Sequence, residues 1–137
     1  MLTETVRQTK GSVGVLICDD QESMRALLEI IIELRPGLHV VGEAEDGDQA
    51  IAQAQRLQPD VILLDLSMPR RTGLDALPEL KRVAPNAKVI VLSGFATSMV
   101  AADVLALGAD RYIEKGVDPD TIAATIEDVA TALIRTV

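Results

Sequence analysis

The sequence predicts a doubly wound α/β domain, in which a five-stranded parallel sheet of strand order 2-1-3-4-5 carries five helices on its two faces. Short apolar runs alternate along the chain with longer segments of helical periodicity, which indicates repeated β-α units. Three of the runs are continuously apolar and rich in β-branched residues, as strands buried on both faces should be. Right-handed crossovers then leave few topologies, and this strand order is the leading one.

Five segments fit strands, and the segments between them fit helices. The expected strands are Val13–Cys18, Leu38–Ala44, Val61–Leu64, Val89–Leu92 and Ala109–Ile113. A first helix over 21–35 has its apolar stripe at Met24, Leu27, Leu28, Ile31 and Leu34. A second helix with its apolar stripe over 51–57 ends before Pro59, as expected for a helix before proline.

The last three helices are predicted from their boundary residues. A third, with apolar positions at 77, 80 and 83, requires that Asp75 caps it and that Pro78 falls in its first turn. A fourth runs from about Thr97 to Leu107, with Gly108 as its C-terminal stop. The fifth begins at Asp118-Pro119, an N-cap followed by proline.

Composition indicates one acidic domain. The chain has 137 residues, of which 48% are hydrophobic, and this supports a single core over 13–137 behind a flexible arm at 1–12. Thirteen basic against 21 acidic residues give a net charge of −8, which argues against nucleic-acid binding by this segment. No apolar run approaches the ~20 residues of a membrane span, and no signal segment opens the chain. A single cysteine, Cys18, excludes an internal disulfide, so we expect a cytoplasmic protein.

Polar residues gather where the predicted strands end. Asp19 and Asp20 follow the first strand and Asp65 the third, while Ser93 and Lys115 close the fourth and fifth. Singly, each has a simpler explanation, such as Asp20 capping a helix. Together, at the ends of neighbouring strands, they exceed what capping requires, and ligands of such folds bind at this edge.

This residue set suits phosphoryl transfer. Three carboxylates repel one another and Lys115 offsets one charge, so a divalent cation with oxygen ligands, Mg²⁺, would relieve the excess. An aspartate nucleophile beside Mg²⁺, with a lysine and a hydroxyl to bind phosphoryl oxygens, is a phosphoryl-acceptor site. Arg70 and Arg71 follow in the next loop; we interpret them as solvated, with attraction of an anionic donor as the alternative.

Four motifs resemble the receiver domain of bacterial two-component response regulators. They are Asp19-Asp20, Asp65-Leu-Ser-Met-Pro69 with Gly73, Ser93-Gly94, and Tyr112-Ile-Glu-Lys115, in this order and all at strand ends. The resemblance runs from about Val13 to the end and implies the CheY-like form of the flavodoxin-like fold. It also implies a phosphoprotein of a two-component phosphorelay that catalyses only its own phosphorylation and dephosphorylation, and is not otherwise an enzyme.

The resemblance implies a role for each matching residue at the acceptor. Asp65 would take the phosphoryl group from a sensor histidine kinase or phosphotransfer protein. Asp20, Asp65 and the backbone carbonyl of Ser67 would bind Mg²⁺ directly, and Asp19 would bind it through water.

The resemblance also implies a switch. Lys115 would pair with the phosphoryl oxygens, Ser93 would hydrogen-bond them, and Tyr112 would turn inward into the space that Ser93 vacates. The face formed by the fourth helix, the fifth strand and the fifth helix would then change, controlling a partner protein or an appended output domain. Homodimerisation through this face is possible.

One position departs from the common receiver pattern, and several alternatives stay open. Gly116 follows Lys115 where many receivers have proline, so we expect a trans bond and a differently shaped loop.

The chain is either a stand-alone receiver or a piece of a longer regulator. An unphosphorylated scaffold is the main functional alternative. An aspartyl-phosphate hydrolase is less favoured because Ser67 stands where such enzymes have a second acid. Phe95 and Tyr112, the two aromatic residues, flank the predicted site.

Overall fold

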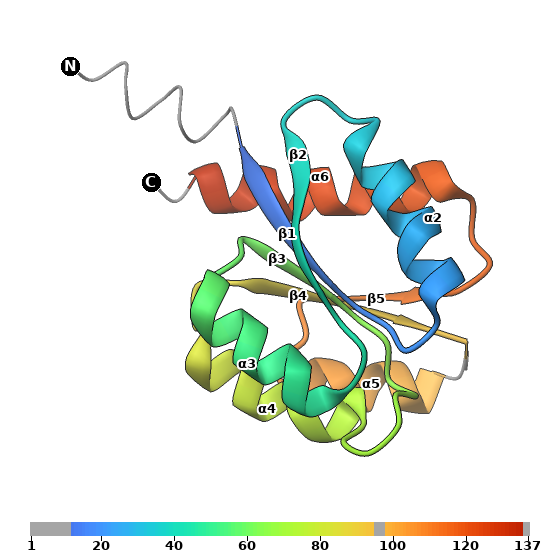
Figure 1. The fold of residues 1–137 in the computed structure, drawn as a ribbon, viewed down its shortest axis with the longest axis vertical. Coiled ribbons are helices and arrows are strands. Elements are labelled where there is room, and N and C mark those ends of the chain that lie inside the picture. The colour runs from blue at the N-terminus through green and yellow to red at the C-terminus, as the bar shows by residue number, and fades with distance from the viewer. Residues whose placement is uncertain (1–11, 95–97, 136–137) are drawn as a thin grey trace.

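The fold is a parallel sheet between two layers of helices (Figure 1). The computed structural model describes residues 12–94 and 98–135, so most of the arm predicted at 1–12, and Phe95, lie outside the described residues. The strands are β1 (Val13–Cys18), β2 (Leu38–Ala44), β3 (Val61–Leu64), β4 (Lys88–Ser93) and β5 (Arg111–Glu114). Every adjacent pair is parallel and the order is β2-β1-β3-β4-β5, which confirms the predicted topology.

Five helices connect and cover the strands in the described part of the chain. They are α2 (Glu22–Glu33), α3 (Gly47–Leu57), α4 (Gly73–Val83), α5 (Ser98–Ala106) and α6 (Pro119–Arg135). Figure 1 shows α2 and α6 on one face of the sheet and α3, α4 and α5 on the other. None of these helices combines the length and the apolar character that a membrane span requires.

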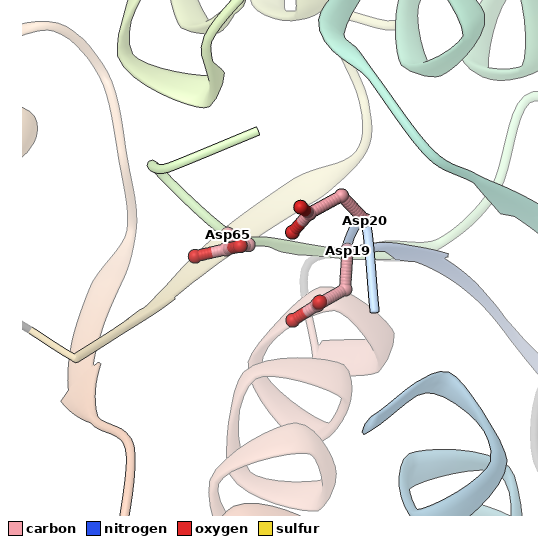
Figure 2. Close-up of side chains that lie close together, drawn as sticks. All are labelled: Asp19, Asp20 and Asp65. Carbon is pink, nitrogen blue, oxygen red and sulfur yellow. The ribbon is translucent and has the colours of Figure 1, made fainter. Parts of the chain in front are cut away.

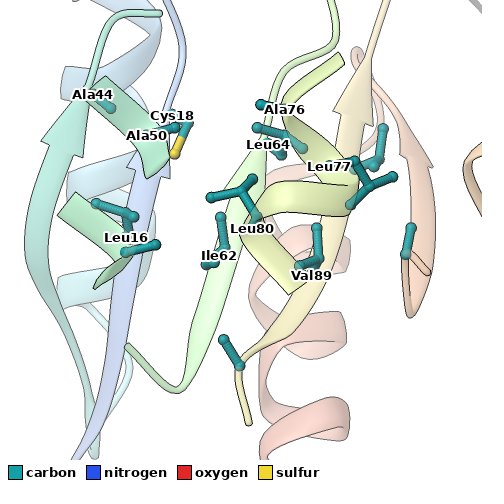
Figure 3. Packing of buried hydrophobic residues seen from close by; sticks show 14 of the residues in the cluster. Leu16, Cys18, Ala44, Ala50, Ile62, Leu64, Ala76, Leu77, Leu80 and Val89 are labelled. Atoms are coloured by element: carbon teal, nitrogen blue, oxygen red, sulfur yellow. The ribbon is translucent and has the colours of Figure 1, made fainter. Parts of the chain in front are cut away.

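Alternation along the strands divides the core in two, because successive side chains point to opposite faces. Leu16, Ile62 and Val89 belong to the cluster beneath α3, α4 and α5 (Figure 3), where Leu77 and Leu80 of α4 pack against the sheet. Ile17 and Leu63 belong to the second cluster, beneath α2 and α6.

Cys18 is 1% exposed, and burial, followed by the charge of Asp19, raises the pKa of its thiol well above the ordinary range. It therefore packs as a small buried apolar residue.

The start of α4 was predicted wrongly. The N-cap is Thr72, whose hydroxyl accepts a hydrogen bond from the Asp75 amide at 3.1 Å, and the helix begins at Gly73. Pro78 therefore lies in the second turn and not in the first. The missing hydrogen bond would have gone to the carbonyl of Leu74, and Leu74 lies on the exposed side of the helix, with 42% of the residue exposed.

Two further expectations need correction. In α2, Leu28 and Ile31 are buried, but Leu27 and Leu34 of the predicted stripe are 47% and 75% exposed, because the buried face is narrower than the apolar one. The fifth strand begins at Arg111, two residues later than predicted. The amide of Ala109 instead donates to the Val104 carbonyl, and this bond ties it to the end of α5.

Candidate functional site

Three carboxylates meet at the carboxyl ends of β1 and β3. The hydrogen-bonding pattern of the sheet continues past β3, because the Asp65 amide donates to the Cys18 carbonyl at 2.9 Å. Asp19 and Asp20 follow Cys18 directly, so this bond brings them beside Asp65. Figure 2 shows the three side chains projecting to the same side, and one oxygen from each lies within 4.8 Å of the others. The predicted cluster of acidic residues is present.

The backbone around the cluster orients two of the carboxylates. Asp19 is 1% exposed and its Oδ1 accepts a hydrogen bond from the Gln21 amide at 2.9 Å. Asp65 is 4% exposed and its Oδ1 accepts from the Ser67 amide at 3.3 Å. Asp20 is exposed, and it does not cap α2, whose N-cap residue is Gln21. The simpler explanation of Asp20 as a helix cap is therefore wrong.

Lys115, directly after β5, reaches across the edge of the sheet to two of these carboxylates. Its Nζ lies 2.9 Å from Oδ2 of Asp19 and 3.4 Å from Oδ1 of Asp65. The side chain is 19% exposed, so these ion pairs are shielded from water more than a surface pair is. One ammonium group thus bridges two buried carboxylates.

Burial and charge shift the pKa values at this cluster. Burial, followed by the negative charge of Asp19, raises the pKa of Asp65, and Lys115 opposes this only in part. Burial lowers the pKa of Lys115, but the hydrogen bond to Asp19 and the charge of Asp65 outweigh it, so that pKa is raised. The ionised form of Asp65 is therefore disfavoured where it stands, and further positive charge at the site would favour it.

The donor set fits a magnesium ion. Three carboxylates face one ammonium group, and the ligand atoms of the three aspartates are all oxygens, the type that Mg²⁺ prefers. Ser67 lies in the loop after Asp65, next to the cluster, as its predicted contribution of a backbone carbonyl requires. The residues present are thus compatible with the cation that the sequence predicted.

Ser93 and Tyr112 share one face of the sheet. The register pairs Val91 with Tyr112 and Ser93 with Glu114, so side-chain alternation puts Ser93, Val91 and Tyr112 on the side of α5. Ser93 is fully buried at the end of β4, and Tyr112 is half-buried against the cluster beneath α3, α4 and α5. Ser93 and Tyr112 therefore lie on neighbouring strands and on the same face of the sheet.

Glycines shape the loops around the cluster. A Cβ atom on Gly73 would lie 2.0 Å from the carbonyl oxygen of Asp65, so only glycine fits where α4 begins. A Cβ atom on Gly94 would meet no atom of the described residues within 4 Å. The Lys115–Gly116 bond is trans, as expected, and Gly116 has a φ of 100°, which favours glycine.

The sequence did not reveal two arginines that brace this edge of the molecule. Arg25 of α2 donates from Nη1 to the Asp19 carbonyl at 2.7 Å and from Nε to Glu43 at 2.7 Å. Arg70 is not simply solvated, because it forms an ion pair with the buried Asp46. One signal could have pointed to Asp46: an aspartate a few residues before the helical pattern of 51–57 is a typical N-cap, and Asp46 is the N-cap of α3.

Comparison with known proteins gives a consistent result. A family model described as response regulator receiver domain matches residues 15–127. The chain is 34% identical over 116 residues to the chemotaxis protein CheY of Thermotoga maritima, covering 85% of this chain and 96% of that protein. It is 44% identical over 115 residues to the nitrate/nitrite response regulator protein NarP of Escherichia coli, covering 82% of this chain and 52% of NarP. The chain thus spans about half the length of NarP.

A solved structure extends the similarity to three dimensions. A chain in the crystal structure of the CheX-CheY-BeF₃-Mg²⁺ complex from Borrelia burgdorferi superposes with a TM-score of 0.81 at 25% identity. The alignment covers 88% of this chain and 96% of that one.

Proposed function

The chain belongs to the receiver-domain family of two-component response regulators, and from this premise we propose that Asp65 accepts a phosphoryl group from a phosphohistidine. The donor would be a sensor histidine kinase or a phosphotransfer protein. The observation that carries the proposal is the bridge that Lys115 forms between Asp65 and Asp19 inside a group of three carboxylates. The three carboxylates repel one another, and Lys115 together with a bound cation would offset this negative charge and that of an incoming phosphoryl group.

In the transfer step, one carboxylate oxygen of Asp65 attacks the phosphorus atom. The bond between phosphorus and the donor's imidazole nitrogen breaks, and the imidazole leaves with the electron pair and takes a proton from water. Because the ionised carboxylate carries no proton to remove, the site needs charge neutralisation and positioning and no general base. The product on this chain is an acyl phosphate at Asp65.

Mg²⁺, when bound, would supply positive charge shared between the carboxylates and the phosphoryl oxygens. Asp20, Asp65 and the backbone carbonyl of Ser67 would hold it directly, with Asp19 acting through water. The relative from Borrelia burgdorferi, solved as a complex with BeF₃ and Mg²⁺, supports this assignment.

The remaining residues would convert the new charge into a change of surface. Lys115, already within 3.4 Å of Asp65, would pair with a phosphoryl oxygen, and the Ser93 hydroxyl would donate a hydrogen bond to another. Tyr112 lies on the same face of the sheet and would fill the space that Ser93 leaves. The face of α5, β5 and α6 would then control a partner protein, an output domain or a second copy of the chain.

The chain would act as a switch in the cytoplasm, with no separate substrate to turn over. The similarity to NarP, of which the chain matches about half, supports control of an output domain as one form of this switch. Acidic character argues against direct nucleic-acid binding by this segment.

The experiment is phosphorylation by acetyl phosphate with Mg²⁺, followed by intact mass. One phosphoryl group should add to the parent and to Asp103→Asn, an exposed carboxylate of α5 removed as a control, but not to Asp65→Asn. Asp20→Ala should need more Mg²⁺ for the same labelling. Labelling of Asp65→Asn equal to that of the parent would contradict the assignment. If the parent neither takes the label nor binds beryllofluoride, the chain is an unphosphorylated scaffold.

A further inference from the structure

The loop between β3 and α4, residues 66–72, is fastened to the start of α3 at its outer end. The guanidinium of Arg70 donates to Oδ2 of Asp46 from Nε at 3.0 Å and from Nη2 at 2.6 Å. Next to this ion pair, the Gly47 amide donates to the Arg71 carbonyl at 2.7 Å. Two consecutive residues of the loop are thus joined to two consecutive residues at the helix start.

The anchor on the helix side is rigid. Asp46 is 4% exposed, and its other oxygen, Oδ1, accepts a hydrogen bond from the Gln49 amide at 2.8 Å as the N-cap of α3. These bonds, first that from Gln49 and then those from Arg70, lower the pKa of Asp46. Both oxygens therefore have fixed partners, and a carboxylate held in this way can fix the position of an arginine.

Arg70 adopts a backbone conformation that needs external support. Its φ is 61°, in the left-handed region that residues other than glycine rarely adopt. Its side chain is 65% exposed, so burial does not hold it there. Gly47 lets the loop approach, because a Cβ atom at that position would lie 2.5 Å from the Arg71 carbonyl oxygen. The contacts beside this residue are its ion pair with Asp46 and the hydrogen bond from Gly47 to Arg71, and both can offset the unfavourable conformation.

The inner end of the same loop meets the acidic cluster. The Ser67 amide donates to Oδ1 of Asp65 at 3.3 Å, and the Gly73 amide closes the loop on the Leu66 carbonyl at 3.1 Å. Ser67 lies between these fixed points and is itself exposed. The position of the Ser67 backbone therefore depends on the contacts at both ends of the loop.

We propose that Arg70 and Asp46 are positioning residues for the cation site: their ion pair holds the 66–72 loop so that the Ser67 backbone stays beside Asp65. This inference rests on the proposed function, because it concerns the same cation. Arg70 touches neither the cation nor the phosphoryl group. Its contribution is to the affinity for Mg²⁺ and not to the rate of transfer once Mg²⁺ is bound.

Electrostatics makes the proposal testable by sign. Arg70→Gln removes a positive charge from the loop whose inner end meets the three carboxylates, and by charge alone this would favour the binding of a cation. If the ion pair positions the loop, Arg70→Gln instead weakens the binding of the cation. Asp46→Asn removes the charge that holds Arg70, and asparagine is still a good N-cap for α3, so this variant should fold. Arg70→Gln changes an exposed side chain and should fold as well. Arg82→Gln is the matched control, because it removes the same charge from an exposed pair within α4, with Glu79.

Two measurements test the proposal on the whole chain. The first is the dissociation constant for Mg²⁺ alone, by isothermal titration calorimetry. The second is the rate of labelling by acetyl phosphate as a function of Mg²⁺. We expect Arg70→Gln and Asp46→Asn each to bind Mg²⁺ about tenfold more weakly, as is typical when the support of a metal ligand is lost. The maximal labelling rate at saturating Mg²⁺ should stay near that of the parent, and the double variant should bind no more weakly than either single one.

The outcomes separate this inference from the proposed function. If the parent binds Mg²⁺ and Arg70→Gln binds it equally or more tightly, the buried Met68, which is 2% exposed, is a sufficient anchor for the loop and the inference is wrong. A drop in melting temperature with an unchanged dissociation constant would give the ion pair a structural role only, and also overturns it. If the parent itself binds no Mg²⁺, both the inference and the proposed function fail.

Discussion

Replacing the acceptor should make the protein more stable. In Asp65→Asn, an amide of nearly the same shape takes the place of a buried carboxylate that lies beside two others. The amide NH₂ can donate to a neighbouring carboxylate and its oxygen can still accept from Lys115 or Ser67, so no buried polar group loses its partners. The main change is therefore the removal of one negative charge.

The size of the effect follows from the distances. Oxygens at most 4.8 Å apart give a repulsion of at least about 3.5 kcal/mol per carboxylate pair at an effective dielectric of about 20. The attraction of Lys115 at 3.4 Å is about 5 kcal/mol on the same scale. Screening at the exposed Asp20 reduces its share of the repulsion, while burial of Asp65 adds a desolvation cost. We expect a net gain of about 1–2 kcal/mol for the variant, or about 3–7 °C in melting temperature for a chain of this size.

The assay is thermal unfolding by circular dichroism, with a chelator present to remove divalent cations. The raised pKa of Asp65 means that the folded state holds this proton more tightly than the unfolded state does. The stability of the parent therefore falls as pH rises through that pKa, and the advantage of the variant is full above it. As pH falls below the ordinary carboxyl range, the carboxyl of the parent is protonated in both states and the two proteins should converge.

Mg²⁺ supplies a second arm of the same experiment. At a concentration one hundred times its dissociation constant, it should stabilise the parent by about 2.7 kcal/mol and the variant much less. The order of the two melting temperatures should then reverse. The reasoning is refuted if, without divalent cations at neutral pH, Asp65→Asn is no more stable than the parent, or if Asp103→Asn gains as much.

Two other substitutions test how the site and the helices are held. Gly73→Ala should cost about 2–3 kcal/mol of stability, because its Cβ atom would collide with the backbone carbonyl of Asp65. Chemical denaturation should show this, whereas Gly94→Ala, which meets open space, should be near neutral; equal effects would contradict the steric argument. Arg35→Ala should cost about 1 kcal/mol, because this half-buried side chain pairs with two acidic residues of α6. Arg82→Ala, which loses one exposed pair, should cost less in the same assay, and a reversed order would show that the pairs of Arg35 with α6 add nothing.

Prediction from sequence was most accurate at the strand ends. Buried parallel strands have a strong signal, and the residue after each strand falls at one common edge of the sheet. The sequence alone therefore places Asp19, Asp65 and Lys115 at one edge of the sheet, and in the structure Lys115 lies within ion-pair distance of both aspartates.

Prediction was less accurate where two nearby residues could each cap the same helix. Asp75 and Thr72 are both acceptable N-caps, and the close approach of Gly73 to the Asp65 carbonyl settled the choice for Thr72. Periodicity alone also overstated the buried face of α2. Leu34 has the spacing of a core residue, but three-quarters of its side chain is exposed.

The sequence by itself determined the order of the strands, the two helical layers and the identity of the acidic cluster with its lysine. These features depend on local periodicity and on the alternation of strand and helix, which neighbouring residues encode. Only the tertiary structure decided that Arg70 pairs with Asp46, 24 positions away, and that Arg25 supports Asp19 from α2. The first contact joins a loop to the start of another helix, and the second joins a helix to the end of the strand before it. Their partners are set by how the helices pack on the sheet, and they leave no periodic trace in the chain.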